Sequence, residues 1–453
     1  MTLPVVTYVT PVDRPSNVAS YFLNPLVWYA GLYSASAALL KLTGFCAFLW
    51  LARTLTVEEY AEFGLLYALQ TGLITFALAG LIEAVVGLMR KHRAADQRKT
   101  LFASANIAFL LMTMTAVVAT FLASLIKQES TSVAVLACVT LSATLLAFSM
   151  FQAQMATLEE KHRTSLYFSF FPPMAAFVGG LIAFSVYLTV ESFFLGAAIG
   201  AVCGLLGLAT HFVGFQGTSE WLAATKLVLV KSTPFVAVAL LSWLSGYGNN
   251  YVISGLFEPV EVARYTFVLT LSSIMQLIAT ALNQVWSPRF YRITHELPFG
   301  EVERKNRLFF RLQGLALGAT GGVVIGLFPA TMAALGGNLL EYRFMTLELF
   351  LLCSAYVVLS PWWHCHNYFL AYDKGPSVMR IALVTSAIGI AVWLLLMWLL
   401  GPLGIYIGFL TQMLLRSIGI AFAAKRYWPV KIAWDGVAVG IMLTLAGFVT
   451  TIF

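Results

Sequence analysis

Residues 62–89 read EFGLLYALQTGLITFALAGLIEAVVGLM, and residues 90–99 continue as RKHRAADQRK. The first stretch contains two acidic side chains and no base, whereas five of the next ten residues are basic. A helix that spans the hydrocarbon core of a bilayer needs about 20 mainly apolar residues. The first stretch is therefore long enough to cross a membrane, and the basic cluster after it marks one side of that membrane.

The same pattern recurs along the whole chain of 453 residues, which is 60% hydrophobic and only 10% charged. A soluble domain has about 25% charged residues, so lipid must cover much of this surface. Only helices satisfy their backbone groups within such spans. We predict an all-α polytopic membrane protein of 12–14 transmembrane helices, with spans near 29–52, 62–89, 101–126, 132–156, 165–188, 192–214, 232–255, 263–288, 308–331, 346–371, 378–400, 402–424 and 433–452.

The loops between these spans alternate in charge. One set, with the N-terminal tail, holds 21 of the 27 bases, and the other set holds four: Arg53, Lys127, Arg264 and Arg343. Positive loops stay in the cytoplasm, which predicts a multi-pass cell (inner) membrane protein with a cytoplasmic N-terminus. The net charge of +7 is thus a topology signal and does not indicate nucleic-acid binding. The basic residues of the first set are Arg14, Arg90, Lys91, Arg93, Arg98, Lys99, Lys161, Arg163, Lys226, Lys231, Arg289, Arg292, Arg304, Lys305, Arg307, Arg311, Lys374, Arg380, Lys425, Arg426 and Lys431.

The two halves of the chain also align with each other. A shift of 202 residues places Glu59 on Glu261 and Phe63 on Tyr265, in the loop and helix that follow the first span of each half. Many transporters consist of two such repeats, with the substrate bound between them. We therefore expect two pseudo-symmetric lobes around a central cavity. The expected parts are a cytoplasmic N-terminal tail (1–28), a six-helix N-terminal lobe (29–214), a cytoplasmic amphipathic connector (215–231), a six-helix C-terminal lobe (232–424) and an extra C-terminal helix (425–453).

Three segments resemble one known family. Residues 39–69, LLKLTGFCAFLWLARTLTVEEYAEFGLLYAL, contain Leu-Ala-Arg, an acidic stretch and an aromatic-Gly pair, here Phe63 and Gly64. Residues 249–267, NNYVISGLFEPVEVARYTF, and 367–384, NYFLAYDKGPSVMRIALV, show the same similarity. The chain resembles the polysaccharide-export flippases, which share a superfamily with the MATE drug exporters and the lipid II flippases.

This resemblance implies the transport of an oligosaccharide linked to undecaprenyl diphosphate, from the cytoplasmic to the outer leaflet, for a surface polysaccharide such as the O-antigen of lipopolysaccharide. It implies no enzymatic activity and no cofactor. The implied partners are the lipid-linked oligosaccharide, membrane lipids and the polysaccharide polymerase machinery. A cation-coupled multidrug exporter of the same fold is the first alternative. A polymerase or ligase enzyme acting on the same carrier is the second, although the short outer loops disfavour it.

Charges inside the spans are the first candidates for function, because a charge at the bilayer centre costs about 2.5–3.5 kcal/mol on insertion scales. Lys41 lies in the middle of the first span, either facing a diphosphate from the cavity or pairing with an acid. Arg416 lies in the twelfth span and either reaches the same cavity or extends to the cytoplasmic surface. Its guanidinium fork suits a diphosphate. Glu83 either carries a coupling proton or pairs with Lys41, and Arg53 either guards the outer exit or anchors the first span at the interface.

Polar and aromatic residues in the seventh and eighth spans form a second set of candidates: Tyr247, Asn249, Asn250, Asn283 and Gln284. Aromatic rings stack on sugars and amides bond to hydroxyl groups, so this set indicates a saccharide cleft. The alternative is hydrogen bonding between helices. His364 and His366, in the stretch PWWHCHNYFLAY, are two residues apart and project to different sides of a helix, which disfavours a metal site.

Overall fold

The computed structural model describes residues 25–89, 95–127, 132–206, 221–372 and 374–452. All regular secondary structure in these ranges is helical. Within the described residues, eleven helices are long and apolar enough to cross a membrane, and the shorter apolar helices Val190–Leu206 and Trp434–Val449 complete the expected set of thirteen. The predicted all-α, multi-span architecture is confirmed. The residues before Pro25, in the expected tail 1–28, lie outside this description.

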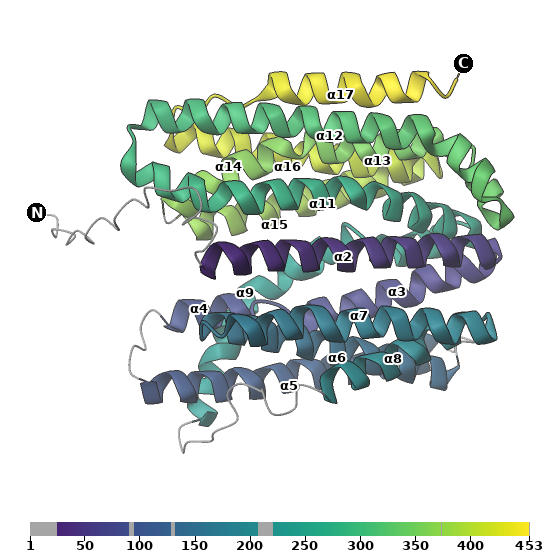
Figure 1. The fold of residues 1–453 in the computed structure, drawn as a ribbon, viewed down its shortest axis with the longest axis horizontal. Helices are drawn as coiled ribbons and strands as arrows, with labels where there is room; N and C mark the ends of the chain where they lie inside the picture. Colours follow the sequence, from purple (N-terminus) through teal and green to yellow (C-terminus); the bar gives the residue numbers. More distant parts are fainter. Residues whose placement is uncertain (1–24, 90–94, 128–131, 207–220, 373, 453) are drawn as a thin grey trace, which may run out of the picture.

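The first half of the chain forms the helices on the darker side of the colour scale in Figure 1. Helix α3 (Val57–Leu78) begins with a capping box, in which the Glu59 carboxylate accepts from the Thr56 backbone N–H at 2.8 Å. The acidic residue of the family-like segment therefore satisfies a free helix end. These helices are α2 (Pro25–Thr54), α3 (Val57–Leu78), α4 (Leu81–Met89), α5 (Ala95–Lys127), α6 (Val133–Leu158), α7 (His162–Tyr187) and α8 (Val190–Leu206).

The second half forms two very long helices and several broken ones. The eighth and ninth spans continue beyond the length that a bilayer needs, so they extend past it at the end that carries the basic loops. The helices are α9 (Trp221–Leu244), α10 (Asn249–Leu256), α11 (Pro259–Glu296), α12 (Phe299–Leu335), the 3₁₀ helix η2 (Gly337–Tyr342), α13 (Thr346–Val358), α14 (Ser360–Ala371), α15 (Gly375–Leu400), α16 (Leu403–Tyr427) and α17 (Trp434–Val449).

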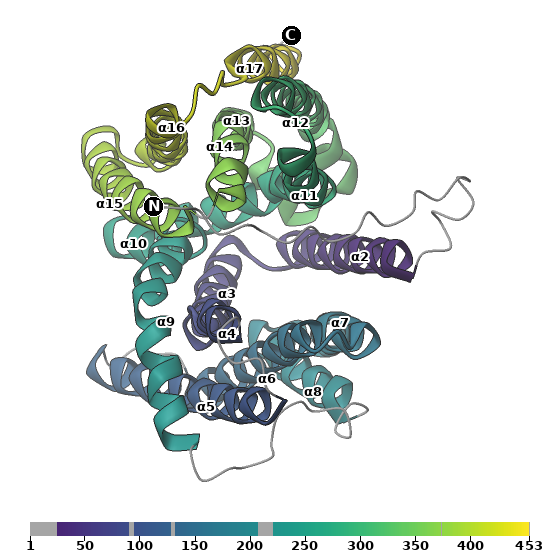
Figure 2. The same ribbon diagram turned by 90° about the vertical axis from the view of Figure 1, so that its left-hand side faces the viewer.

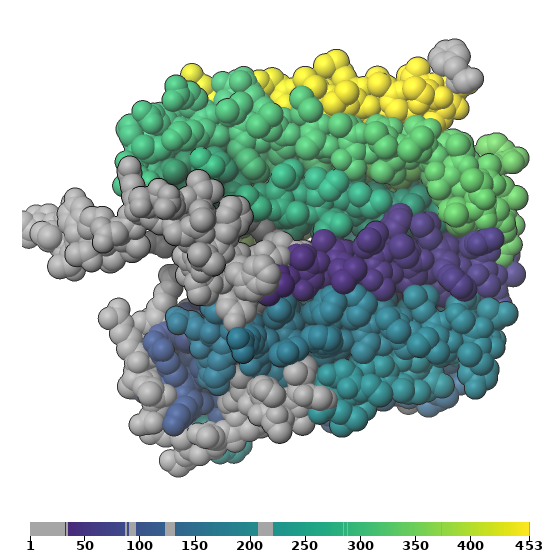
Figure 3. All heavy atoms as spheres, in the orientation of Figure 1, coloured from purple at the N-terminus to yellow at the C-terminus, as the bar shows by residue number. Residues whose placement is uncertain are grey.

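The helices fall into two groups, which Figure 2 shows end on. Helices α3–α8 form the N-terminal group, and α11–α17 form the C-terminal group. Helix α2 lies between them and contacts α7 on one side and α11 on the other. In the space-filling view it runs along the surface between the two groups (Figure 3). Helix α9 also joins the groups, because it packs on α3, α4 and α5 and on α15.

The two groups meet at the end of the molecule where α2 ends and α3 and α11 begin, here called the closed end. One apolar core crosses the boundary there, and Tyr60 of α3 contacts the ring of Phe267 in α11 with centroids 6.4 Å apart. Phe267 stacks in turn on Tyr342 of η2 at 4.3 Å. At the opposite, basic end, each group has a core of its own, around Phe151 in one and Phe290 in the other.

The described part of the expected amphipathic connector is helical and belongs to α9. Residues 221–231 form the first turns of α9, which continues without a break to Leu244. Gly246 and Gly248 lie in the turn between α9 and α10, and a Cβ added at Gly248 would lie 2.8 Å from the Leu244 Cα atom, so the chain passes close to itself there. The predicted span 232–255 is therefore divided into two helices. Residues 215–220 of the expected connector lie outside the described ranges.

Candidate functional site: two adjoining cavities

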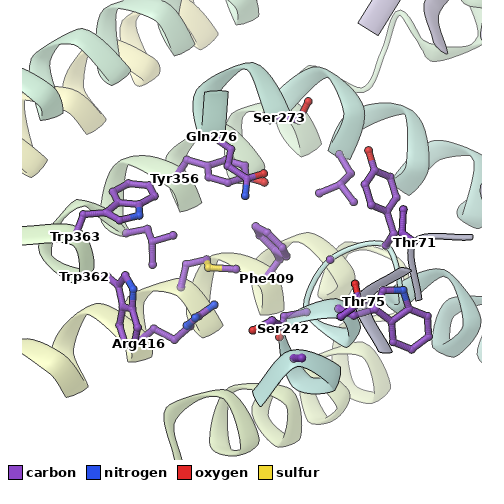
Figure 4. A pocket seen from close by; sticks show the side chains of 18 residues that line it. Thr71, Thr75, Ser242, Ser273, Gln276, Tyr356, Trp362, Trp363, Phe409 and Arg416 are labelled. Atoms are coloured by element: carbon purple, nitrogen blue, oxygen red, sulfur yellow. The ribbon is translucent and has the colours of Figure 1, made fainter. Parts of the chain in front are cut away.

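The first cavity lies between the two groups of helices and has a volume of about 500 Å³. Hydroxyl groups and aromatic rings dominate its wall, and Arg416 is the one charged residue among the described residues that line it (Figure 4). It takes side chains from α3, α9, α11, α13, α14 and α16 and from the turn between α9 and α10. Its lining residues are Thr71, Thr75, Ala239, Ser242, Trp243, Ser245, Gly246, Tyr247, Leu269, Ser273, Gln276, Tyr356, Leu359, Trp362, Trp363, Phe409, Met413 and Arg416.

The second cavity adjoins the first and has a volume of about 580 Å³. Its wall is largely aliphatic and aromatic, and within the described part of the chain Lys41 is the one charged residue in it. Tyr247, Ser273 and Gln276 line both cavities. These three residues form the boundary between the two cavities, which is called the window below. The other lining residues, from α2, α3, α6, α7 and α11, are Leu40, Leu42, Gly44, Phe45, Phe48, Tyr67, Met150, Phe177, Thr270, Ile274 and Leu277.

Lys41 and Arg416 lie at similar depths. Lys41 is 13 residues before Thr54, the end of α2, and Arg416 is 13 residues after Leu403, the start of α16. Both helix ends are at the closed end, so a rise of 1.5 Å per residue places each base about 20 Å from it. The structure therefore brings the two predicted bases to the two cavities at one level.

Neither base has an acidic partner among the described residues. Lys41 is exposed on α2. Arg416 is half-buried, and its guanidinium lies over the ring of Trp362 with Cζ 4.9 Å from the ring centroid. The Arg416 Nε atom is buried and has no hydrogen-bond partner within the described part of the chain. A cation held in this way is available to an anion that enters the cavity.

Tyr247 is the candidate from the seventh span that reaches the cavities. It lies in the turn between α9 and α10, and its ring meets Tyr67 of α3 edge-on at 4.9 Å. Asn249 and Asn250 are buried away from both cavities. The Asn249 side chain donates to the Tyr265 hydroxyl at 2.9 Å. The Asn250 side chain donates to the Gly64 carbonyl and to the Thr266 hydroxyl, each at 2.9 Å.

Asn283 and Gln284 belong to the basic half of α11. Asn283 lines neither cavity. Its side-chain oxygen Oδ1 accepts a hydrogen bond from the side-chain amide of Asn367 in α14 at 3.2 Å. The Gln284 side chain lies outside the described residues. For Asn249, Asn250 and Asn283 the structure thus shows hydrogen bonds between elements, which was the alternative to a saccharide contact.

Arg53 is exposed at the end of α2 and packs against Gly337 of η2, where an added Cβ would lie 2.8 Å from the Arg53 carbonyl oxygen. Beside it, the Asn338 amide donates to the Leu55 carbonyl at 2.6 Å. Arg53 is therefore part of the contact between α2 and the C-terminal group at the closed end. Glu83 is exposed on α4 and lines neither cavity, and within the described residues no ion pair joins it to Lys41.

Two tryptophans of the first cavity were not among the sequence candidates. Trp362 and Trp363 are adjacent in α14 and both line the cavity. His364, in the same stretch, is fully buried and stacks on Phe310 at 4.9 Å. Among the described residues, no three His, Cys, Asp or Glu side chains are grouped to hold a metal ion. The signal that points to the tryptophans is the aromatic pair itself in the middle of a span.

The fold is that of a multi-span membrane protein with two adjoining cavities between two groups of helices. The chain belongs to the polysaccharide biosynthesis protein family, whose sequence model matches residues 27–294. No curated protein sequence is similar enough to be matched to it.

Several solved structures share this fold. One is the lipid II flippase MurJ in an inward closed conformation, with a TM-score of 0.67, 13% identity and coverage of 93% of this chain and 98% of that chain. Another is an inward-facing MATE family multidrug transporter, with a TM-score of 0.67, 14% identity and coverage of 85% and 94%. The bent form of a Vibrio cholerae MATE transporter has a TM-score of 0.53, 16% identity and coverage of 93% and 96%. At these identities the likeness is one of fold.

Proposed function

We propose that the chain is a flippase that moves an oligosaccharide linked to a polyprenyl diphosphate across the cell (inner) membrane by alternating access, without covalent chemistry. The observation that carries this proposal is the pairing of cavities with opposite character. Such a substrate has an apolar tail, an anionic diphosphate and a hydroxyl-rich saccharide. The apolar cavity suits the tail, Lys41 suits the diphosphate, and the hydroxyl-lined cavity suits the saccharide.

The membership in the polysaccharide biosynthesis protein family supports a saccharide substrate. The charge of the cavities supports it as well. Among the described residues their lining holds Lys41 and Arg416 and no carboxylate, which disfavours a cationic drug. An anion that leaves water needs fixed positive charge to offset the loss of its hydration. In this proposal the export serves a surface polysaccharide, such as the O-antigen of lipopolysaccharide, and the polymerase machinery receives the product.

The conformation fits the loading step of such a cycle. If the basic loops are cytoplasmic, as their charge predicts, the closed end faces outward and the two groups separate toward the cytoplasm. The cavities would then receive the substrate from the cytoplasmic leaflet. The five-part division of the chain, with α9 crossing between the lobes, remains part of this proposal, and Arg53 belongs to the outer closure. Glu83 remains a candidate for proton coupling through a route outside the two cavities.

The test is transport in proteoliposomes that contain a fluorescent undecaprenyl-diphosphate oligosaccharide. The wild-type protein should expose the label to an impermeant quencher, and Lys41→Ala should abolish this at equal protein abundance. Lys41→Arg should retain part of the activity because the charge is kept. Lys305→Ala, on the exposed basic end of α12, is the matched control and should transport normally. Wild-type activity in Lys41→Ala would refute the role of Lys41, and efflux of a cationic dye without lipid flipping would favour the drug exporter.

A further inference from the structure

The two unpaired bases belong to different cavities. Lys41 lines only the apolar cavity, and Arg416 lines only the hydroxyl-lined one. The window of Tyr247, Ser273 and Gln276 separates them. A diphosphate bound beside the apolar cavity, where its prenyl tail must lie, is therefore met by Lys41. Arg416 is left without an anion in a cavity that the diphosphate does not fill.

The Arg416 side chain also packs on an aromatic ring. Its guanidinium lies against Trp362, which limits the directions in which its N–H groups point. In Figure 4 the side chain extends into the cavity beside Trp362, across from Thr71. Its buried Nε atom finds no acceptor among the described residues. A planar fork with fixed direction and free donors matches a carboxylate, which accepts two parallel hydrogen bonds from it.

The rest of this cavity is neutral. Thr71, Ser242 and Ser273 supply hydroxyl groups, and Gln276 supplies an amide. These groups exchange hydrogen bonds with sugar hydroxyls and give no preference for charge. Within the lining, only Arg416 can distinguish an acidic sugar from a neutral one.

We propose that Arg416 and Trp362 form a subsite for a carboxylate on the oligosaccharide, so that the chain selects a repeat unit that contains an acidic sugar such as a uronic acid. This inference rests on the proposed function. It assigns the diphosphate to Lys41 and the second negative charge of the substrate to Arg416.

The test uses two synthetic ligands, each a short-chain polyprenyl diphosphate carrying the same trisaccharide with its outermost residue as either glucuronic acid or glucose. Binding to the purified full-length protein in lipid nanodiscs is measured by titration calorimetry. A hydrogen bond to a charged group contributes about 1.5–3 kcal/mol, so the glucuronate ligand should bind about 10- to 150-fold more tightly to wild type. The Arg416→Gln variant should bind both ligands with the affinity that the wild-type protein has for the ligand ending in glucose. Arg416→Lys, which keeps charge without the fork, should retain part of the preference.

Two further variants separate the possible failures. The Lys41→Gln variant should bind both ligands more weakly by the same factor. The Lys305→Gln variant should bind each ligand with the wild-type affinity. Equal binding of the two ligands to wild type would overturn the carboxylate subsite and leave the flippase intact. An equal loss of affinity for both ligands in the Arg416→Gln variant would also overturn the carboxylate subsite, because it would assign Arg416 to the diphosphate. Absence of binding of either ligand to wild type would overturn the proposed function as well. Elution as a single monodisperse peak shows that each variant is folded before it is titrated.

Discussion

The replacement of Gly64 by alanine should open the closed end. Gly64 lies where α3 crosses α11, and a Cβ added there would be 2.4 Å from the Thr266 hydroxyl oxygen. Both neighbours are fixed, because the Asn250 amide binds the Gly64 carbonyl and the Thr266 hydroxyl together. The two helices belong to different groups, so they can relieve the clash by moving apart.

The size of the effect follows from the cost of excess volume in a packed contact, which is about 1–3 kcal/mol. The added Cβ clashes with Thr266 only in the state in which α3 and α11 are in contact at the closed end. The substitution therefore raises the free energy of this state relative to one that is open there, and 1–3 kcal/mol shifts the ratio of the two by about 5- to 150-fold. Thr266→Ala removes the hydroxyl oxygen and should reverse much of the shift.

Ser273→Cys provides the reporter, because Ser273 lines the window between the cavities and cysteine has nearly the same shape. The five native cysteines are first replaced. A membrane-impermeant maleimide added from the side of the closed end should label Ser273→Cys slowly in the parent and faster, by up to the same 5- to 150-fold, with Gly64→Ala. Gly255→Ala is the control, since a Cβ at Gly255 meets no atom within 4 Å. Equal labelling rates in Gly64→Ala and Gly255→Ala would refute the reasoning.

Two further predictions concern topology and the last helix. A reporter active only outside the cytoplasm should give a signal when fused after residue 128 and none after residue 96, because the basic loops stay inside; the reverse would overturn the orientation. Gly440→Leu should lower the melting temperature, since its Cβ would lie 2.6 Å from the Gly314 carbonyl oxygen, whereas Gly300→Leu, with no atom within 4 Å of its Cβ, should not. Equal melting of the two variants would show that α17 does not depend on this close contact with α12.

The number and the approximate ends of the spans could be predicted because they depend on local properties of the sequence. Apolar length and loop charge do not require knowledge of what a helix packs against. The division of the seventh span was not predicted, although Gly246 and Gly248 are visible in the sequence. A glycine within an apolar run is compatible with both a continuous and a broken helix, and contacts with α3 and α11 decide between them.

The candidate site, too, could be predicted only where local properties of the sequence decide. Lys41 and Arg416 could be selected because a charge in a span is costly wherever the helix packs. Asn249 and Asn250 are polar like Gln276, yet they are buried between helices while Gln276 lines both cavities. The rotation of each helix about its axis makes this difference. The polar residues of helix α11 are spread around all of its faces, so its sequence does not indicate which side faces the cavities.

The contact that closes one end of the molecule continues directly into the cavity walls. On α3, Gly64 at the crossing is followed by Tyr67 and Thr71, at steps of three and four residues that keep them on one face of the helix. On α11, Thr266 is followed in the same way by Thr270 and Ser273. The faces that meet at the closed end thus become, two turns further, the facing walls of the passage. A movement that separates α3 from α11 must therefore also move the window between the two cavities. In the proposed transport cycle, release at this end and loss of the binding geometry are then parts of one motion.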